Sequence, residues 1–376
     1  MKNENIKIIV AVAITFLLTI TFTSIIPNIK SNNIKELKSK NEVKNKTFAV
    51  MLQGEEGYVA SEDDTWPTSG YTLNEELTNC IDNSGTKIEN ALNYENGQVS
   101  LKSNKNLFCY LYFDYNYLSK KIISLSNISE SNVYNEGDAG YRYEGLEVNN
   151  YISFNAEVWR IIGVEEGSKI GLESGKYYAK IIRNENFSMA YDSDNNHEND
   201  WSKTASYNTL NGDYFNKTGS YASTGLSSSA KNLMIEAKWY YSAVGSSYPT
   251  YKTVDWYNYE RIDETKVIRD SVGMLSPSDY GYASPQSECS AIALNSYGSS
   301  CVNKNWIYKT VNELFKIPYS GNSNSVFRIY NGNVNYASGI TMSLIIRPVV
   351  YLDYDILIIN HGDGTLENKY EIGRYN

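Results

Sequence analysis

The sequence predicts a strand-rich α+β protein that follows an N-terminal transmembrane helix and a short stalk. Residues 8–26 form a run of 19 without a charged side chain. After residue 47, short apolar segments alternate with Gly, Pro, Asn and Asp, a pattern typical of strands and turns. Tyrosine occurs 34 times, against 10 Phe and 6 Trp. Tyrosine suits β-sheets, where its polar tip can reach solvent or a ligand.

The apolar run is long enough to span a membrane as a helix. At about 1.5 Å per residue it covers roughly 28 Å, the thickness of one hydrocarbon core. No A-x-A cleavage site follows it, and it exceeds the apolar core of about 7–15 residues found in signal peptides. We interpret residues 1–29 as a signal anchor, with a cleaved signal peptide as the alternative. Residues 30–46, rich in Lys, Asn and Ser, form the predicted stalk.

Charge and cysteines give opposing indications of orientation. The six lysines between residues 30 and 46 favour a cytoplasmic stalk. The four cysteines favour export, and their spacing suggests the bridges Cys80–Cys109 and Cys289–Cys301 among three possible connectivities. Unpaired thiols in a cytosolic protein are the alternative. Residues 47–376 carry a net charge of −14, which also favours export. We expect a single-pass protein of the cell membrane with its C-terminal part outside.

Composition divides the exported part into three segments. We predict a small β-sandwich-like module at 47–115, a polar linker at 116–140 and an α+β ligand-type domain at 141–376. The sequence predicts strands at 48–52, 107–113, 158–162, 177–182, 326–330 and 344–351, the last at a sheet edge or bulge because it contains Pro348. Asn96-Gly97 and Asn331-Gly332 predict hairpin turns. Apolar residues at helical spacing behind Ser227–Ser229 predict a helix over 230–241.

Several functional classes are excluded. General nucleic-acid binding needs a basic face, whereas the whole chain carries a net charge of −9. The sequence contains no G-x-S-x-G elbow, P-loop or G-x-G-x-x-G motif. His197-Glu198 begins a zinc-protease pattern, but Trp201 occupies the position of the second histidine. We therefore expect no resident cofactor other than calcium.

An acidic segment between residues 192 and 200 is the candidate calcium site. Its four carboxylates are interleaved with amides, and such oxygen ligands suit Ca²⁺; they belong to Asp192, Asp194, Glu198 and Asp200. The segment is not an EF-hand loop, because His197 and Lys203 replace the turn glycine and the bidentate glutamate. The alternatives are an irregular calcium loop and a solvated acidic loop.

Aromatic residues gather between positions 239 and 259. Gly245, Pro249 and nearby serines place several of the rings on a loop. Exposed rings stack on sugar faces or fill a pocket of a protein partner. The alternative is that they belong to the core and its rim. The candidate ligand-binding residues are Tyr248, Tyr251 and Trp256.

The larger domain contains five motifs: Ala139–Gly145, Glu157–Gly163, Val272–Ala283, Ile346–Leu352 and Gly362–Thr365. Together they resemble a widespread family of uncharacterised surface or secreted proteins of Gram-positive anaerobes. More remotely, Trp159–Ile162, Leu210-Asn211 and Arg347-Pro348 resemble the C-type-lectin-like fold shared with formylglycine-generating enzymes. The resemblance implies that fold and a binding role. It does not imply the enzymes' chemistry, because no cysteine follows Cys301.

Together these observations predict a membrane-anchored extracellular binding or adhesion protein whose ligand is a glycan or a protein. One alternative is an extracytoplasmic glycan hydrolase, which requires two carboxylates about 5–9.5 Å apart in one cleft. A second alternative is a structural surface-layer component.

Overall fold

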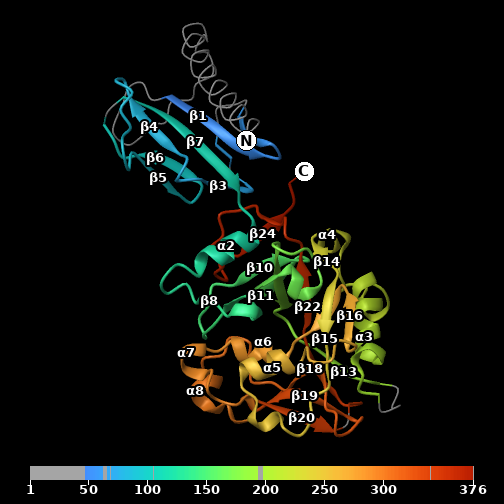
Figure 1. The fold of residues 1–376 in the computed structure, drawn as a ribbon. Coiled ribbons are helices and arrows are strands. Elements are labelled where there is room, and N and C mark those ends of the chain that lie inside the picture. The colour runs from blue at the N-terminus through green and yellow to red at the C-terminus, as the bar shows by residue number, and fades with distance from the viewer. Residues whose placement is uncertain are drawn as a thin grey trace, which may run out of the picture. The chain divides into compact units, whose positions relative to one another are not determined.

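The computed structural model describes residues 47–375 apart from 62–65, 68, 105, 194–197 and 339. The chain divides into two compact units (Figure 1). Of the described residues, the first unit contains 47–66 and 73–114, and the second contains 67–72 and 115–375. The predicted anchor and stalk, residues 1–46, lie outside the described residues. No helix in the described part is long and apolar enough to cross a membrane.

The first unit is built on a twisted sheet with a separate hairpin. Its central strand is β7 (Leu107–Tyr115), which runs parallel to β1 (Thr47–Gly54) and antiparallel to β4 (Asn79–Asp82). Every second residue of β7 from 107 to 113 is buried, as expected for a strand with one face on a core. The remaining strands are β2 (Gly57–Ala60), β3 (Tyr71–Leu73), β5 (Leu92–Glu95) and β6 (Gln98–Leu101).

Two local predictions are confirmed in this unit. Strands β5 and β6 form the predicted hairpin, and Asn96 and Gly97 adopt φ of 50° and 71° at its turn, as a type I′ turn requires. Cys80 and Cys109 lie directly opposite each other on β4 and β7 and form a disulfide.

The second unit contains two large sheets. The ten-stranded sheet has the order β14-β22-β12-β11-β10-β24-β23, with β17 beside β22 and the pair β8–β9 beside β11. The five-stranded sheet has the order β13-β21-β18-β19-β20, and β15 pairs with β16 alone. With few and short helices, the unit is strand-rich α+β, which confirms the predicted fold class.

The strands of the second unit are mostly short. Those of the ten-stranded sheet are β8 (Val133–Asn135), β9 (Tyr141–Tyr143), β10 (Tyr151–Phe154), β11 (Glu157–Glu166), β12 (Tyr177–Arg183), β14 (Met234–Ile235), β17 (Val272–Met274), β22 (Pro348–Leu352), β23 (Leu357–Ile358) and β24 (Tyr370–Gly373). The others are β13 (Phe187–Ala190), β15 (Ala237–Tyr240), β16 (Val267–Asp270), β18 (Glu313–Pro318), β19 (Ser325–Tyr330), β20 (Asn333–Ser338) and β21 (Ser343–Ile346).

Short helices cover these sheets. The α-helices are α2 (Leu118–Leu125), α3 (Ala205–Thr209), α4 (Ser228–Lys231), α5 (Thr253–Tyr259), α6 (Pro277–Tyr282), α7 (Gln286–Cys289) and α8 (Gly298–Val302). A π-helix, η5 (Leu210–Tyr214), continues α3. The 3-10 turns are η2 (Gly137–Ala139), η3 (Gly167–Ile170), η4 (Trp201–Lys203), η6 (Gly219–Tyr221), η7 (Tyr248–Thr250) and η8 (Leu294–Ser296).

The predicted linker at 116–140 is wrong. This segment contains α2 and β8 and belongs to the second unit. Leu118, Ile122 and Val133 are buried in its core, and α2 packs against β11 and β12. The helix buries one face and leaves its polar side chains outside, so the segment's average composition resembles that of a linker.

The predicted helix over 230–241 is also wrong beyond its first turn. Ser227 caps α4 as expected by accepting from the Ala230 N–H, but α4 ends at Lys231. The chain then forms β14, which pairs with β22, and β15, which pairs with β16. Burial in β15 alternates, with Ala237 and Trp239 inside and Lys238 outside. Pairing with neighbouring strands therefore overrides a spacing that also fits a helix.

The predicted strand at 344–351 is divided by its proline. Residues before Arg347 form β21 in the five-stranded sheet, and β22 begins at Pro348 in the ten-stranded sheet. Because β22 has neighbours on both sides, the predicted edge position is wrong. Pro348 is tolerated as the first residue of the strand. The hairpin of β19 and β20 forms at Asn331-Gly332 as predicted.

Candidate functional site

Seven ionic side chains meet inside the second unit, and we call them the ionic cluster. Four are cations and three are carboxylates: Arg142, Lys180, Arg261 and Lys316 with Glu165, Glu260 and Asp279. Six of the residues are buried to 3% exposure or less, and the Arg261 side chain is 19% exposed. The cluster therefore holds one more positive charge than negative charge in a setting that disfavours uncompensated charge.

The register of the ten-stranded sheet brings part of this cluster together. Gly163 of β11 lies opposite Arg142 of β9 and opposite Lys180 of β12. A Cβ atom at residue 163 would lie 2.9 Å from the Cδ atom of Arg142, so a glycine there leaves room for the arginine. Residues two apart on a strand share a face, which places Glu165 beside both cations.

Two carboxylates of the cluster are paired with cations, although the Oε2 atom of Glu165 accepts no hydrogen bond among the described residues. The Lys180 Nζ lies 2.8 and 2.9 Å from the two Asp279 carboxylate oxygens. Arg142 donates to Asp279 at 3.1 Å and to Glu165 at 2.8 Å. Burial alone would raise the pKa of Asp279 and Glu165, but Lys180 and Arg142 hold both below their usual range. These groups remain ionised at neutral pH and stabilise the packing of α6 on the sheet.

Glu260 and Arg261 form the boundary of the cluster. Glu260 accepts from the Ser278 N–H at 2.8 Å and from its hydroxyl at 2.6 Å. Burial raises the pKa of Glu260, and Lys316 and Arg261 only partly offset this. The Arg261 guanidinium lies 3.8 Å from the centre of the Tyr257 ring and 5.2 Å from that of Tyr240.

Lys316 is the least compensated cation. Its Nζ contacts the Ser276 hydroxyl and lies 3.3 Å from the Met274 carbonyl oxygen. Among the described residues, no carboxylate forms an ion pair with it, although Asp279 and Glu260 lie near enough to attract it. Burial, reinforced by Lys180, lowers the pKa of Lys316 to about 8.

Two adjoining pockets open next to this cluster. The inner one, which we call the chamber, has room for about one water molecule and is lined by Lys180, Lys316, Ser276, Glu260, Trp239 and Tyr351, among others. The outer one, which we call the mouth, is open to solvent and includes Lys169 and Tyr257. Lys238, Tyr240 and Arg261 line both pockets. Arg261 therefore lies at the boundary between an open surface and a buried, cation-rich space.

Local sequence explains how β15 supplies the walls of both pockets. Lys238 and Tyr240 alternate with the buried Trp239, so they share the opposite face of the strand. The Trp239 indole donates to the Asp270 carbonyl oxygen at 2.9 Å. A Cβ atom at Gly273 would lie 2.4 Å from the Trp239 ring, so only glycine leaves space for this indole.

The contacts near the chamber bear on two types of catalysis. Ser276 and Lys316 resemble a nucleophile and its base, but the nearby Ser276 and Ser278 N–H groups already donate to Asp279 and Glu260. An acyl-transfer site needs such donors for an oxyanion. Glycoside hydrolysis needs two carboxylates; Glu260 lines the chamber, and Asp138 and Glu264 line the mouth.

The aromatic segment between residues 239 and 259 is more buried than predicted. Trp256 lies in α5 with no exposed surface and packs edge-on against Phe327 at 4.9 Å. Tyr248 is 8% exposed and donates to the Asn335 side chain at 2.8 Å. Tyr251 is half-buried and stacks on Tyr259. The expected exposure is therefore wrong for Trp256 and Tyr248, while ligand binding at these three residues remains a prediction.

The acidic segment lies only in part within the described residues. Asp194 is outside them, and Asp192 is buried, with its Oδ1 3.4 Å from the Ala205 nitrogen. Asp200 lies 2.6 Å from the Lys266 Nζ, and Glu198 lies 3.4 Å from the Lys203 Nζ. In the described part of the chain, no group of three or more His, Cys, Asp or Glu side chains is placed to hold a metal ion. Calcium binding remains a prediction.

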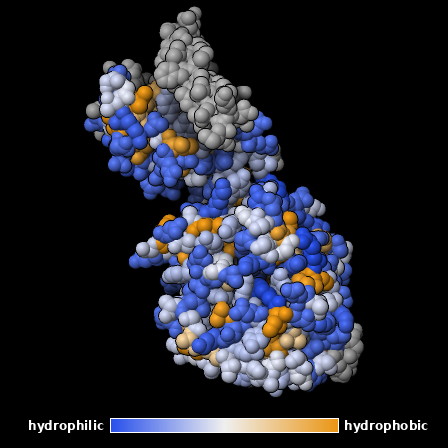
Figure 2. Space-filling model, in the orientation of Figure 1, coloured by the Kyte–Doolittle hydropathy of each residue, from blue (hydrophilic) through white to orange (hydrophobic). Residues whose placement is uncertain are grey.

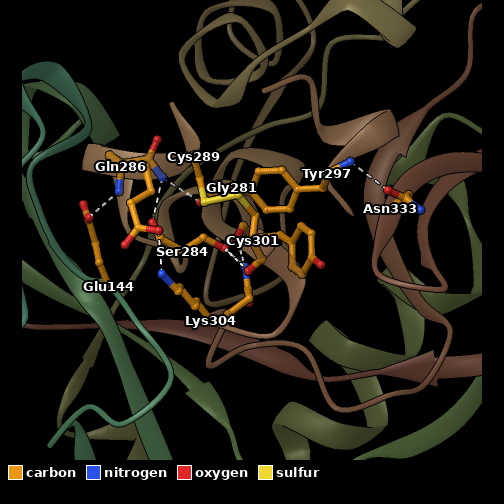
Figure 3. The surroundings of a disulfide bond; sticks show 12 residues. Glu144, Gly281, Ser284, Gln286, Cys289, Tyr297, Cys301, Lys304 and Asn333 are labelled. Carbon is orange, nitrogen blue, oxygen red and sulfur yellow. Dashed lines mark hydrogen bonds and ion pairs between the residues drawn. A yellow bond between two sulfur atoms is a disulfide. The ribbon is translucent and has the colours of Figure 1, made fainter. Parts of the chain in front are cut away.

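The second predicted disulfide, Cys289–Cys301, is also confirmed and joins α7 to α8 (Figure 3). Beside it, the Gln286 N–H donates to the Glu144 carboxylate at 2.8 Å, and burial raises the pKa of Glu144 to about 9. Tyr297 donates through its N–H to the Asn333 side chain, which ties this region to β20. The two bridges indicate an extracellular or secreted protein.

The visible face of the second unit is largely polar. On the face of the second unit in Figure 2, the described side chains are mostly hydrophilic and the apolar ones form small separate groups. Such a pattern is ordinary for a protein surface in water.

No protein-family model, curated protein or solved structure matches this chain. The resemblance to surface proteins therefore remains a prediction, and the contacts of the ionic cluster and its pockets are the evidence for a site. Sequence reasoning missed the ionic cluster because its members are spread from residue 142 to 316. The available signal was a single charge inside an apolar strand, as at Lys180 and Lys316.

Proposed function

We propose that the protein is a membrane-anchored extracellular binding protein and that the mouth of the second unit binds a glycan or protein ligand. The supporting observation is the Arg261 guanidinium, which lies against Tyr257 and Tyr240 in a pocket open to solvent. The half-buried Tyr240 ring offers a stacking surface to a sugar, and the guanidinium offers hydrogen-bond donors, while the buried Tyr257 ring supports Arg261. The proposal includes a C-type-lectin-like fold, anchored by the apolar run at residues 8–26.

The mouth is already organised for binding. Arg261 is held by Glu260 at 3.4 Å and by Glu165 at 3.8 Å, so little side-chain freedom remains to be lost when a ligand binds. Lys169 is paired with Asp138 at 2.6 Å at the rim. Lys238 is exposed beside Tyr240 and has no ion-pair partner among the described residues. A ligand that stacks on Tyr240 therefore meets Lys238 and Arg261, together with the Glu264 carboxylate that also lines the mouth.

A glycan array probed with the full-length protein in detergent tests this proposal. We expect binding to a subset of glycans and at least a tenfold loss of affinity in Lys238→Glu, since the added carboxylate reverses the charge beside Tyr240. Lys252→Glu is the matched control, because Lys252 is equally exposed but lies outside the mouth. Equal binding by Lys238→Glu and Lys252→Glu, or no binding to any glycan or surface protein, would contradict the proposal.

A further inference from the structure

We infer that the chamber behind Arg261 binds an anionic group of the ligand, a carboxylate or a sulfate, while the rest of the ligand occupies the mouth. This inference rests on the proposed function and specifies the chemical class of the ligand. Its first support is charge balance: four cations and three carboxylates form the ionic cluster. A buried excess charge is costly, and a bound anion removes that cost.

The second support is the set of hydrogen-bonding groups that line the chamber. Lys316 offers an ammonium group and Ser276 offers a hydroxyl, while Lys180 adds positive charge but already donates to Asp279. Glu260 is the one carboxylate among the described lining residues, and both of its oxygens already accept from Ser278. A space lined mainly by donors selects a ligand group that accepts hydrogen bonds, and an oxyanion accepts the strongest ones.

The third support is an unpaired donor at the boundary of the two pockets. The Nε of Arg261 is buried and has no acceptor within hydrogen-bond distance in the described structure. The two terminal nitrogens of Arg261 lie near the Tyr257 carbonyl oxygen and the carboxylates of Glu260 and Glu165. An oxyanion at this boundary would accept from Nε and so satisfy a donor that otherwise costs free energy.

The size of the chamber separates the two parts of the ligand. The chamber has room for about one water molecule, so it admits an oxygen atom of a carboxylate or sulfate, whereas the rest of that group and a stacked sugar ring need the open mouth. Tyr240 lines both pockets, so a ring stacked there projects its acidic group towards Lys316. Acidic monosaccharides are therefore expected to bind more tightly than neutral ones.

Binding should depend on pH through Lys316. The charged groups that face it are Lys180 of β12, Asp279 of α6, and Glu260 and Arg261 after α5, with Ser276 as its direct contact. With a pKa of about 8, its ammonium loses its proton as the pH rises from 7 to 9. A bound anion favours the charged form. Affinity should therefore fall over this range, and binding near pH 8 should take up a proton.

Isothermal titration of the full-length protein in detergent tests the inference with glucuronate, glucose 6-sulfate and glucose. We expect both acidic sugars to bind at least tenfold more tightly than glucose at pH 7. The sugar that binds more tightly identifies carboxylate or sulfate as the preferred group. Lys316→Met should lose this preference and its pH dependence. Lys309→Met is the matched control, because burial also lowers the pKa of Lys309 to about 8 but Lys309 contacts Asn184 instead of the chamber.

Inorganic sulfate provides a second, sugar-independent readout. It should raise the melting temperature of the wild type and Lys309→Met more than that of Lys316→Met. If Lys316→Met does not fold, Ser276→Ala replaces it and should show the same loss.

Equal responses of the chamber and control variants to sulfate and to all sugars overturn the inference. If glucose and the acidic sugars bind equally and Lys238→Glu abolishes both, the proposed function holds and the chamber inference fails. If sulfate distinguishes the variants but no glycan or protein binds, the proposed function fails and the anion site remains.

Discussion

The two units stabilise their folds in different ways. In the described part of the first unit, no charged side chain is buried, and the core consists of apolar residues and one disulfide. The second unit buries the complete set of carboxylates of the ionic cluster in addition to a large apolar core. A small core has few groups with which to compensate a buried charge, so a covalent link is the more effective device. A larger core can surround each charge with partners, and it can leave one cation for a ligand.

The largest effect is expected from removing a charge at the centre of the ionic cluster. In Asp279→Asn, Glu165 is the one carboxylate that still pairs with Lys180 and Arg142. Breaking a buried ion pair typically lowers the free energy of unfolding by about 3–5 kcal/mol. Urea unfolding measures the loss in the second unit. Asp263→Asn, at an exposed turn, serves as the control and should leave stability unchanged. Equal stability of the two variants would show that the cluster contributes little to the fold.

Trp256→Ala separates a core role from a ligand role in the aromatic segment. Because the ring has no exposed surface and packs on Phe327, its removal should cost about 3–5 kcal/mol of stability. Tyr259→Ala, which removes a ring 38% exposed, should cost about 0.5–1.5 kcal/mol. Thermal melting and glycan binding are measured on both. A stable Trp256→Ala protein that no longer binds glycans would support the prediction that Trp256 contacts the ligand.

Loss of a disulfide should affect the first unit more than the second. A bridge that spans 29 residues stabilises by about 3–4 kcal/mol through chain entropy, and one that spans 12 residues by about 3 kcal/mol. The double replacement of Cys80 and Cys109 by Ser should therefore unfold the unit with the smaller core at 37 °C. The corresponding replacement of Cys289 and Cys301 should leave the second unit folded. Proteolysis followed by mass spectrometry identifies which unit unfolds. Equal resistance of the two variants to the protease would contradict the expected difference between the units.

Acid should destabilise the second unit through its carboxylates. In the folded state the pKa of Asp279 and of Glu165 is depressed, so their stabilisation is complete above the unfolded value of about 4 and is lost as the pH falls through the folded values. Stability of the second unit, measured by urea unfolding between pH 4 and pH 2, should decrease as the pH falls. Above about pH 4, protonation of Glu144 and Glu260 acts in the opposite direction, because burial raises the pKa of both in the folded state. Asp279→Asn should weaken the dependence of the free energy of unfolding on pH. If the dependence is unchanged in this variant, groups other than Asp279 cause it.

The smallest effect is expected from calcium. If residues 192–200 bind the ion, millimolar Ca²⁺ should raise the melting temperature by mass action, and Asp194→Ala should remove the rise. Asp200 is already paired with Lys266, so few free charges remain and the shift should be a few degrees at most. No shift in the wild type would show that the segment is a solvated loop.

Local patterns in the sequence determined the strands, the two hairpins and the cysteine pairs. An Asn-Gly pair between alternating residues specifies a turn without help from distant parts of the chain, as at Asn331-Gly332. Short separations likewise favour bridges such as Cys289–Cys301. These features depend on neighbours in the chain, and for that reason composition and spacing suffice to predict them.

Other features were decided by the tertiary structure alone. The segment after Ser227 fits a helix by spacing, but free strand edges on β22 and β16 make it two strands. The ring of Trp256 turns inward because Phe327 of a strand about 70 residues later offers it a packing surface. The ionic cluster needs Arg142, Lys180 and Lys316 from three strands at once. These cations and the carboxylates around them compensate one another only after folding removes the water between them, so no local pattern in the chain records the site.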